Sequence, residues 1–321
     1  MNILSIISPL IVVALLGYIC TKTRWLSRDQ LNALSKFTFS ISIPAFLFYQ
    51  MAKADLSDQV SPQLFAAFYL PVLTCYLITW LISYFFYKEK HLNNRDNTSK
   101  KDSAASAVFA LGASYSNTVI VGLPVLLASM GEQVIGIIFL IVTFHSAMLF
   151  ALTSAISTKA NSQHGMKIFI WVNFIKQTVN NPLIISILSG LVINILGISL
   201  PDFLQASLSL ISKPAIPLAL FILGASLAFY QVRQELTFIS IACFSKLILL
   251  PILVLIASQY IFKLDPLIVT VLVILSACPT GVNAYLIAVT HQQHQQTVAG
   301  TVVLSTLLSI VSVPLWLSFI L

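Results

Sequence analysis

The sequence carries very little charge. Asp, Glu, Lys and Arg make up 8% of its 321 residues, and hydrophobic residues make up 58%, whereas soluble domains are about 25% charged and about 45–50% apolar. A composition so poor in charge excludes a soluble globular protein. The chain is therefore predicted to be an integral membrane protein.

Acidic residues are absent from the centres of the apolar runs, because all ten Asp and Glu residues fall in predicted loops or at the edges of runs. Proton relays and sodium sites usually recruit a carboxylate at depth. A coupling mechanism based on carboxylates is therefore disfavoured, although backbone carbonyls could still hold Na⁺. The ten residues are Asp29, Asp55, Asp58, Glu89, Asp96, Asp102, Glu132, Asp202, Glu235 and Asp265.

Cysteine pairs and catalytic motifs are also lacking. The four cysteines, Cys20, Cys75, Cys243 and Cys278, have no CxxC spacing, which argues against a disulfide framework and a zinc site. The sequence contains no HExxH or GxSxG motif, so the chain is predicted not to be an enzyme and to use no cofactor or metal. Its basic residues are spread over several loops and form no continuous stripe, which argues against a nucleic-acid partner.

The sequence does contain long apolar runs. Runs of about 20 apolar residues, enough to cross about 30 Å of hydrocarbon, recur along the whole chain and predict an all-α membrane protein with ten transmembrane helices. The first run lacks a basic leader region and a clear cleavage site, so we expect it to be a retained helix. The predicted spans are residues 3–21, 31–51, 63–87, 104–129, 134–157, 169–196, 204–230, 237–262, 267–289 and 297–320.

The distribution of basic residues predicts the orientation. With the amino terminus outside, the inner loops hold 11 Lys and Arg residues, and the outer loops hold only Lys53 and Lys263. Positive charge favours the cytoplasmic side of a membrane. We therefore expect a multi-pass protein of the cell inner or plasma membrane, with both termini outside the cytoplasm.

An internal repeat is visible at a constant offset of 173 residues, which pairs "IPAFLF" at 43–48 with "IPLALF" at 216–221. The offset also pairs Pro9 with Pro182 and Gly17 with Gly190. Each copy holds five spans, residues 1–160 and residues 161–321, and an odd number inverts the second copy in the membrane. Such 5+5 inverted repeats are common in secondary transporters. They also occur in channels, so the repeat leaves carrier and pore open.

Two spans are interrupted by polar and helix-breaking residues. The fourth contains "SYSNTVIVGLP" (114–124) and the ninth contains "SACPTGVNAYLIA" (276–288). Ordinary kinks would explain an isolated Pro, but matched clusters in corresponding spans point to a binding site. Non-helical backbone at this depth is tolerated only where protein or a water-filled cavity satisfies it.

The breaks predict an anion site. We expect Gly122 and Pro124 to make the first break, and Pro279 and Gly281 the second, because Pro ends one half-helix and suits the start of the next. The half-helix N-termini after each Pro would then offer free N–H groups and partial positive charge to an anion. The side chains that can add hydrogen bonds are those of Ser114, Ser116, Asn117, Thr118, Thr280 and Asn283.

A few ionisable residues lie inside spans. His145, near the centre of the fifth, is a candidate for a proton relay or a substrate hydrogen bond, with a plain interhelical hydrogen bond as the alternative. Lys213 could attract an anion, although a snorkelling or helix-pairing role is favoured for it. Lys36 and Lys246, nearer the span ends, are expected to be snorkelling anchors.

The motifs "SNTVIVGLP", "NPLIISILSGLVINILGISLP", "PLALFILGASLA" and "CPTGVNAYLIA" resemble those of the auxin efflux carrier family over essentially the whole chain. The resemblance implies broken fourth and ninth helices that cross beside the substrate. It also implies a scaffold of helices 1, 2, 6 and 7, often dimerising, and a moving core of helices 3–5 and 8–10 that works by an elevator-like alternation. Asn117, Pro124, Pro279 and Asn283 fall on motif positions.

The predicted function is secondary transport of a small organic anion. The chain lacks the long central loop of the plant members, so a carboxylate such as malate or malonate is favoured over auxin. The alternatives are a passive anion channel, a sodium-coupled symporter like the bile-acid transporters, and a sensor that binds the ligand without moving it. The candidate substrate-binding residues are Ser116, Asn117, Thr118, Gly122, Pro124, His145, Pro279, Thr280, Gly281 and Asn283.

Overall fold

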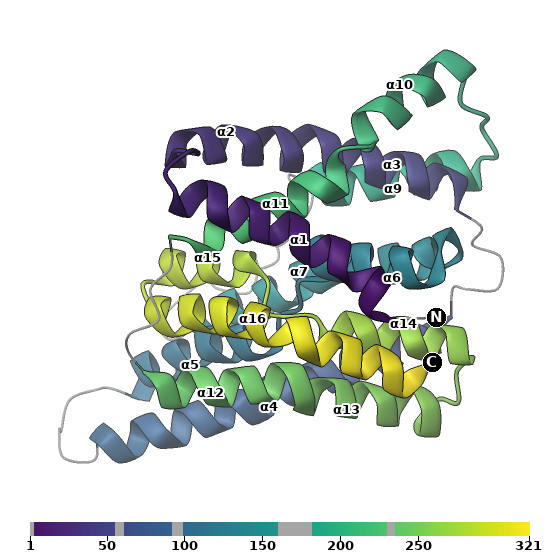
Figure 1. Cartoon of the computed structure of the whole chain (residues 1–321). Helices are drawn as coiled ribbons and strands as arrows, with labels where there is room; N and C mark the ends of the chain where they lie inside the picture. Colours follow the sequence, from purple (N-terminus) through teal and green to yellow (C-terminus); the bar gives the residue numbers. More distant parts are fainter. Residues whose placement is uncertain (1–2, 55–60, 92–98, 160–181, 230–234) are drawn as a thin grey trace. The chain divides into compact units, whose positions relative to one another are not determined.

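The computed structural model describes residues 3–54, 61–91, 99–159, 182–229 and 235–321, and these residues are almost entirely helical (Figure 1). The helices are α1 (Ile3–Lys22), α2 (Arg28–Phe37), η1 (Thr38–Ser42), α3 (Ile43–Lys53), α4 (Pro62–His91), α5 (Ser99–Ser114), η2 (Thr118–Gly122), α6 (Leu123–Met130), η3 (Glu132–Val134), α7 (Ile135–Lys159), α9 (Pro182–Ile195), α10 (Asp202–Ser212), α11 (Ala215–Leu227), α12 (Leu236–Phe244), η4 (Ser245–Leu249), α13 (Leu250–Leu255), η5 (Ile256–Ile261), α14 (Pro266–Ala277), α15 (Val282–His291) and α16 (Gln295–Ile320).

Among the described residues, six helical stretches are long and apolar enough to cross a membrane. Five shorter apolar helices lie within other predicted spans, and the part of the predicted sixth span before residue 182 lies outside the described residues. The chain is therefore an all-helical protein with several candidate membrane spans. The six long stretches are Arg28–Lys53, Pro62–Phe86, Glu132–Ser157, Asp202–Leu227, Leu236–Ile261 and Gln295–Ile320.

Three of the helical stretches contain a short π-helical turn that ends two residues before a proline. The turns η1, η2 and η4 precede Pro44, Pro124 and Pro251, respectively. Proline lacks an N–H and its ring clashes with the carbonyl four residues earlier in a regular α-helix. The wider π turn changes this hydrogen-bond register, so each helix continues through its proline.

The chain forms two compact units. Unit 1 comprises Met1–Ser61, Val119–Thr143 and Gln177–Tyr230, and unit 2 comprises Pro62–Thr118, Phe144–Lys176 and Gln231–Leu321. Unit 1 therefore contains α1 to α3, α6, the first part of α7 and α9 to α11. Unit 2 contains α4, α5, the rest of α7 and α12 to α16.

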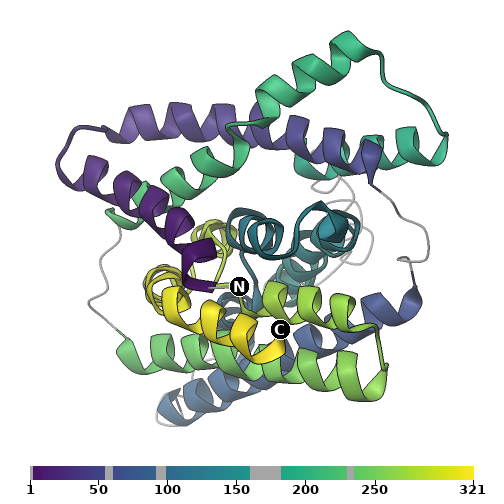
Figure 2. The same cartoon turned by 45° about the vertical axis from the view of Figure 1, so that its right-hand side comes forward.

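Unit 1 is held together by two helix pairs in which glycines allow the backbones to touch. Helix α1 packs against α11, and α3 packs against α9, a pairing that Figures 1 and 2 both show. A Cβ atom on Gly17 would lie 2.0 Å from the carbonyl oxygen of Phe221, and one on Gly190 would lie 2.6 Å from that of Phe48. Both positions therefore require glycine, as close helix packing in membranes often does.

These two contacts are related by the offset of the predicted sequence repeat. The offset of 173 residues takes Gly17 to Gly190 and Phe48 to Phe221. In one helix pair the glycine comes from the first copy and the phenylalanine from the second, and in the other pair the copies exchange places. This exchange is the pattern that a two-fold relation between the copies would produce.

Unit 2 is a bundle in which α5 packs against α4 and α12, and α16 packs against α12, α14 and α15. Phe109 and Ala113 of α5 form an apolar cluster with Ala242 of α12. Phe68 of α4 and Phe109 are among the largest fully buried side chains. Unit 2 also contains α14 and α15 of the ninth predicted span and α5 of the fourth.

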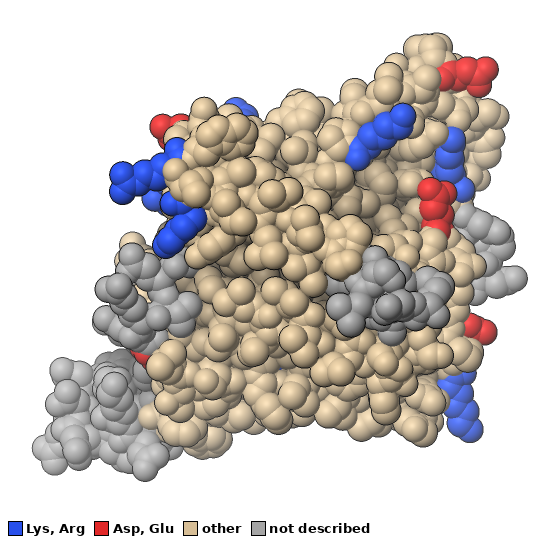
Figure 3. Space-filling view, viewed as in Figure 1, with Lys and Arg blue, Asp and Glu red and all other residues tan. Residues whose placement is uncertain are grey.

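The described charged residues lie mainly at helix ends. Lys22 is in the last turn of α1 and Lys53 in the last turn of α3, whereas Asp202 begins α10 and Asp265 is the N-cap residue of α14. In Figure 3, Lys and Arg are blue and Asp and Glu are red. Most of these side chains lie toward the margins of the face in view, with wide uncharged areas elsewhere. This distribution suits helices that pass through hydrocarbon.

Candidate functional site

The first interruption lies at Tyr115–Asn117, which we call the first break. Helix α5 ends at Ser114, and the chain becomes helical again at Thr118. The prediction that Gly122 and Pro124 make this break is wrong: Gly122 ends the η2 turn and Pro124 lies in the first turn of α6, inside a continuous helical stretch. The π turn ahead of Pro124 accommodates its ring, so the proline does not stop the helix.

The second interruption lies at Cys278–Gly281, which we call the second break. Helix α14 ends at Ala277, and α15 begins at Val282 with Gly281 as its N-cap residue. Pro279 and Gly281 thus lie where the sequence predicts a break. Proline has no N–H with which to close the last turn of α14.

The two breaks pair with each other along their backbones, all within unit 2. Ser116 and Thr280 form an isolated antiparallel β-bridge. The Asn117 N–H donates to the Pro279 carbonyl at 2.8 Å, and the Gly281 N–H donates to the Tyr115 carbonyl at 3.2 Å. This pairing satisfies backbone groups that neither interrupted helix can satisfy alone, which is the requirement for non-helical backbone at depth.

Each bridging residue also gives its backbone N–H to a side chain of the next predicted span. The Ser116 N–H donates to Nε2 of His145 in α7 at 3.0 Å, and the Thr280 N–H donates to Oγ of Ser305 in α16 at 3.0 Å. The Thr280 hydroxyl donates to the Gly112 carbonyl at 2.8 Å. His145 is fully buried, and its Nε2 must be unprotonated to accept this bond. The geometry therefore gives His145 an interhelical hydrogen bond to the first break, and its role as a proton relay or substrate contact stays a prediction.

Tyr115 links the two breaks through its side chain. Its ring stacks on the His145 ring with centroids 5.1 Å apart, and its hydroxyl lies 2.8 Å from the hydroxyl of Ser146. The Asn283 amide donates to the Tyr115 hydroxyl at 3.5 Å. A Cβ on Gly281 would lie 2.4 Å from Cε1 of Tyr115, so a glycine is needed behind the ring.

The paired breaks bring polar groups of both interrupted spans together. Ser116, Asn117 and Thr280 are buried, whereas Asn283, in the first turn of α15, is exposed. The Ser116 hydroxyl and Nδ1 of His145 are buried without a hydrogen-bond partner among the described residues. No side chain caps the start of α15, and its first turn contains no acidic residue. An arrangement of amide, hydroxyl and helix-start groups without carboxylates can bind an anion.

The structure places the predicted site residues in two groups. Unit 2 contains Ser116, Asn117, Thr118, His145, Pro279, Thr280, Gly281 and Asn283, whereas Gly122 and Pro124 belong to unit 1. A substrate role for Gly122 and Pro124 stays a prediction. Sequence reasoning missed Tyr115 and Ser305, although Tyr115 stands inside the quoted "SYSNTVIVGLP" motif. Ser305 had no such signal, because an isolated Ser in an apolar helix is common.

Lys246 corrects another prediction. It was expected to be a snorkelling anchor near a span end, but its side chain is fully buried and its ammonium donates to the carbonyl of Ser276. Lys36 and Lys213 are exposed, by contrast. The distance of Lys246 from the span end does not predict this burial, because burial depends on the helices that pack around η4.

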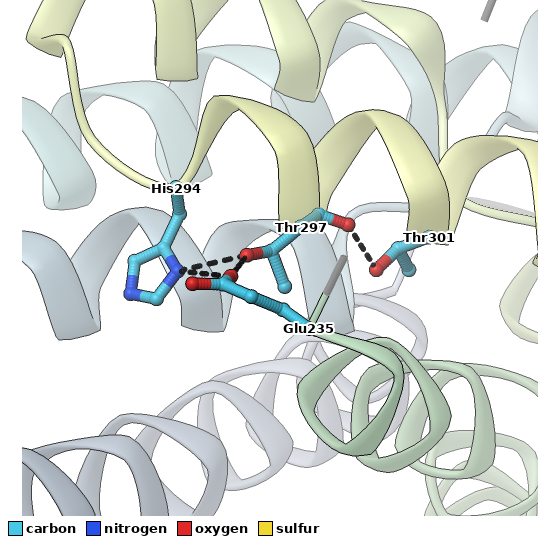
Figure 4. A network of polar contacts seen from close by, with 4 residues as sticks. All are labelled: Glu235, His294, Thr297 and Thr301. Carbon is cyan, nitrogen blue, oxygen red and sulfur yellow. Dashed lines mark hydrogen bonds and ion pairs between the residues drawn. The ribbon is translucent and has the colours of Figure 1, made fainter. Parts of the chain in front are cut away.

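A second polar cluster joins the starts of α12 and α16 (Figure 4). Glu235 precedes α12 and accepts a hydrogen bond from the Thr297 hydroxyl. Nδ1 of His294 lies 3.1 Å from the same hydroxyl and 3.8 Å from the Glu235 carboxylate. Burial lowers the pKa of His294, and the nearby Glu235 carboxylate opposes this shift. The cluster fixes where two helices of unit 2 begin.

The described residues contain no group of three or more His, Cys, Asp and Glu side chains that could hold a metal ion. The candidate site is thus built from backbone, amide, hydroxyl and aromatic groups. Such a set can bind and orient a ligand through hydrogen bonds and helix dipoles.

Comparison with known proteins gives a consistent result. The model of a family described as membrane transport protein matches residues 3–317. A protein named "Putative malonate transporter" from Rhizobium meliloti (strain 1021) is 22% identical over 312 residues, which cover 97% of this chain and 94% of the relative. The "Uncharacterized transporter YfdV" of Escherichia coli (strain K12) is 24% identical over 317 residues, covering 96% and 95%. An "Uncharacterized transporter" of Methanothermobacter thermautotrophicus is also 24% identical over 317 residues, covering 97% and 96%.

Proposed function

We propose that this chain, which belongs to the membrane transport protein family, is a secondary transporter that binds a small organic anion at the paired breaks of unit 2. The observation that carries the proposal is the backbone pairing of Ser116 with Thr280. It brings the polar residues of two separate spans to one place, and interrupted spans are where secondary transporters bind their substrates.

The chemistry of the paired breaks suits a carboxylate. The uncapped start of α15 supplies N–H groups and partial positive charge. The amides of Asn117 and Asn283 and the hydroxyls of Ser116, Thr118 and Thr280 supply further donors. The described residues place no carboxylate in this set, so nothing in it repels an anion. A relative whose printed name is malonate transporter makes small dicarboxylates the first substrates to test.

The mechanism in this proposal is alternating access with two inverted five-helix copies. The repeat is supported by two equivalent helix contacts: Gly17 packs against the Phe221 carbonyl, and Gly190 packs against the Phe48 carbonyl. Unit 1 holds the described parts of predicted spans 1, 2, 6 and 7, together with α6 and the first part of α7 from predicted spans 4 and 5. In the proposal, spans 1, 2, 6 and 7 serve as the scaffold and as the expected dimer contact. Unit 2 holds the paired breaks and carries the substrate.

The test is uptake of radiolabelled malonate or malate into proteoliposomes by the wild type, Asn117→Ala and Asn283→Ala. Each variant removes one amide from the breaks, so we expect the apparent affinity for substrate to fall about tenfold, the effect of about 1.4 kcal/mol. Gln259→Ala, an exposed amide in η5, is the matched control and should transport like the wild type. Wild-type rate and affinity in both Asn variants would reject the site.

Counterflow separates a carrier from an anion channel. The site of a carrier must return to the outside before it can bind labelled substrate again, and it returns either empty or with substrate bound. Unlabelled malonate inside the vesicles lets it return with substrate bound, so it should accelerate entry of the labelled substrate. A channel shows no such acceleration. A linear dependence of flux on concentration without acceleration from the opposite side would therefore favour the pore.

A further inference from the structure

Lys246 is a buried cation that the proposed site does not use. Its side chain is fully buried, and it stands in η4, the π turn in the middle of the apolar stretch Leu236–Ile261. Carrying an ammonium group into a dry interior costs several kcal/mol unless other groups compensate. An ionisable residue retained at this depth is therefore expected to serve a function.

The compensation comes from a helix end. The Lys246 ammonium donates to the carbonyl of Ser276, in the last turn of α14 just before the second break. The last four carbonyls of a helix have no partner within it, and they carry partial negative charge. Because Pro279 has no N–H, it cannot close this turn. The carbonyl end of α14 is thus a position that favours a cation.

The described residues offer Lys246 no acidic partner. The ion pair they contain, between His294 and Glu235, is a separate cluster. The ionisable groups that interact with the Lys246 charge are the thiols of Cys75 and Cys278 and the ring of His145. None is a carboxylate, and His145 already accepts a hydrogen bond through Nε2. Carbonyl oxygen is therefore the chief partner of the ammonium.

In broken-helix transporters, the carbonyl ends of half-helices are where coupling cations such as Na⁺ bind. We infer that the Lys246 ammonium is a tethered cation that occupies the carbonyl end of α14 in place of Na⁺, so that transport by this protein does not depend on Na⁺. Lys246 is a positioning residue in this scheme, because it holds the second break through Ser276. The inference rests on the proposed function, and it removes the sodium-coupled alternative.

The first measurement uses the wild-type protein in proteoliposomes, with Na⁺ replaced by choline on both sides at constant ionic strength. We expect malonate flux to change by less than about twofold. A flux that falls tenfold or more in choline would overturn the inference while leaving the transporter proposal intact. If no organic anion is transported in either salt, the proposed function fails instead, so the two failures are distinguishable.

The second measurement tests the tethered cation without transport. Lys246→Ala removes the ammonium and leaves room at the carbonyl end of α14. Methylammonium should then raise the melting temperature of this variant more than tetramethylammonium does, because only methylammonium can donate hydrogen bonds, and a ligand that binds the folded state stabilises it. Neither cation should shift the wild type, nor the Lys263→Ala variant, which changes an exposed lysine.

Lys246→Met separates charge from volume. This variant keeps most of the side-chain volume without the charge, so we expect at least a tenfold lower flux that methylammonium does not restore. In Lys246→Ala, methylammonium should restore flux at least threefold. Wild-type flux in Lys246→Met, or equal effects of both ammonium ions on Lys246→Ala, would show that the side chain only fills space. If Lys246→Ala does not fold, the Na⁺ replacement and Lys246→Met still decide the inference.

Discussion

The two breaks perform the same structural task with different residues. The second break contains Pro279 and Gly281, whereas the first, Tyr115–Asn117, contains neither proline nor glycine. Yet each bridging residue has its N–H bound by a side chain of the next predicted span, and the residues that flank it form the backbone hydrogen bonds across the pair. The first break is therefore defined by the partners that satisfy its backbone, and the second also by residues that cannot continue a helix.

The carbonyl ends of the preceding half-helices differ as well. Near the end of α5, the thiol of Cys75 lies 3.9 Å from the Ala113 carbonyl oxygen, whereas near the end of α14 the Lys246 ammonium binds the Ser276 carbonyl. The carbonyl end of α5 is thus contacted by a thiol, and the carbonyl end of α14 by an ammonium group. The difference teaches that two matched breaks can have similar backbone pairing while the groups bound at their helix ends differ in charge.

The largest effect is expected from Gly281→Ala, which adds a Cβ atom at the close contact between the second break and Tyr115. The new Cβ would lie 2.4 Å from Cε1 of Tyr115, and the ring is also stacked on His145. We expect a destabilisation of about 1–3 kcal/mol, the usual cost of overpacking, and at least a tenfold loss of flux. The control is Gly112→Ala, whose Cβ would meet the side chain of Val298, with the nearest atom at 3.1 Å. Equal effects of the two substitutions would contradict the role of the tyrosine ring.

The next effect is expected from His145→Phe at the first break. The change keeps an aromatic ring beside Tyr115 and removes the acceptor of the Ser116 N–H. A buried N–H without a partner costs about 1–3 kcal/mol, which should appear as a lower melting temperature and a lower free energy of unfolding. His145→Gln, which offers an amide oxygen, should recover part of the loss. If His145→Phe is as stable as the wild type, the bond does not hold the break.

Ser305→Ala makes the equivalent change at the second break. It removes the acceptor of the Thr280 N–H, and we expect a smaller loss than for His145→Phe, about 1 kcal/mol, because Pro279 and Gly281 still favour the break. Ser309→Ala is the control, since the Ser309 hydroxyl bonds only a carbonyl of its own helix. A larger loss at Ser305 than at His145 would reverse the comparison of the two breaks.

The smallest effect concerns pH and the cluster of Figure 4. Burial holds the pKa of His294 below its ordinary value in the folded protein. The unfolded chain therefore binds a proton more readily, so stability falls as the pH drops from about 6.5, the ordinary value for His, toward the lower folded value. His294→Gln should flatten the melting temperature across this range. An unchanged slope would show that other groups cause it.

Much of the fold follows from the sequence because apolar length and breaker residues act locally. The runs predicted helices wherever the structure describes them, and Pro279 with Gly281 predicted the second break. The resemblance to the auxin efflux carrier family is confirmed by a family model that matches nearly the whole chain. The inverted repeat, the crossing of the broken helices and the substrate remain proposals.

The rest depends on tertiary contacts that one sequence does not reveal. Pro124 failed as a break because a π turn precedes it, and such a turn has no strong sequence signature. Lys246 was assigned to a span end, but the depth of its side chain depends on the helices packed around η4. Ser305 accepts a hydrogen bond from a residue 25 positions away, a pairing that only the folded bundle brings about.

The most direct test of the account is equilibrium binding of malonate to the purified protein, measured by titration calorimetry in the wild type and in Asn283→Ala. The exposed amide of Asn283 can be removed without opening the core, so the melting temperature without ligand should stay within about 2 °C of the wild type. We predict a dissociation constant at least about tenfold higher in the variant, corresponding to about 1.4 kcal/mol. An unchanged dissociation constant would contradict the claim that the paired breaks hold the anion.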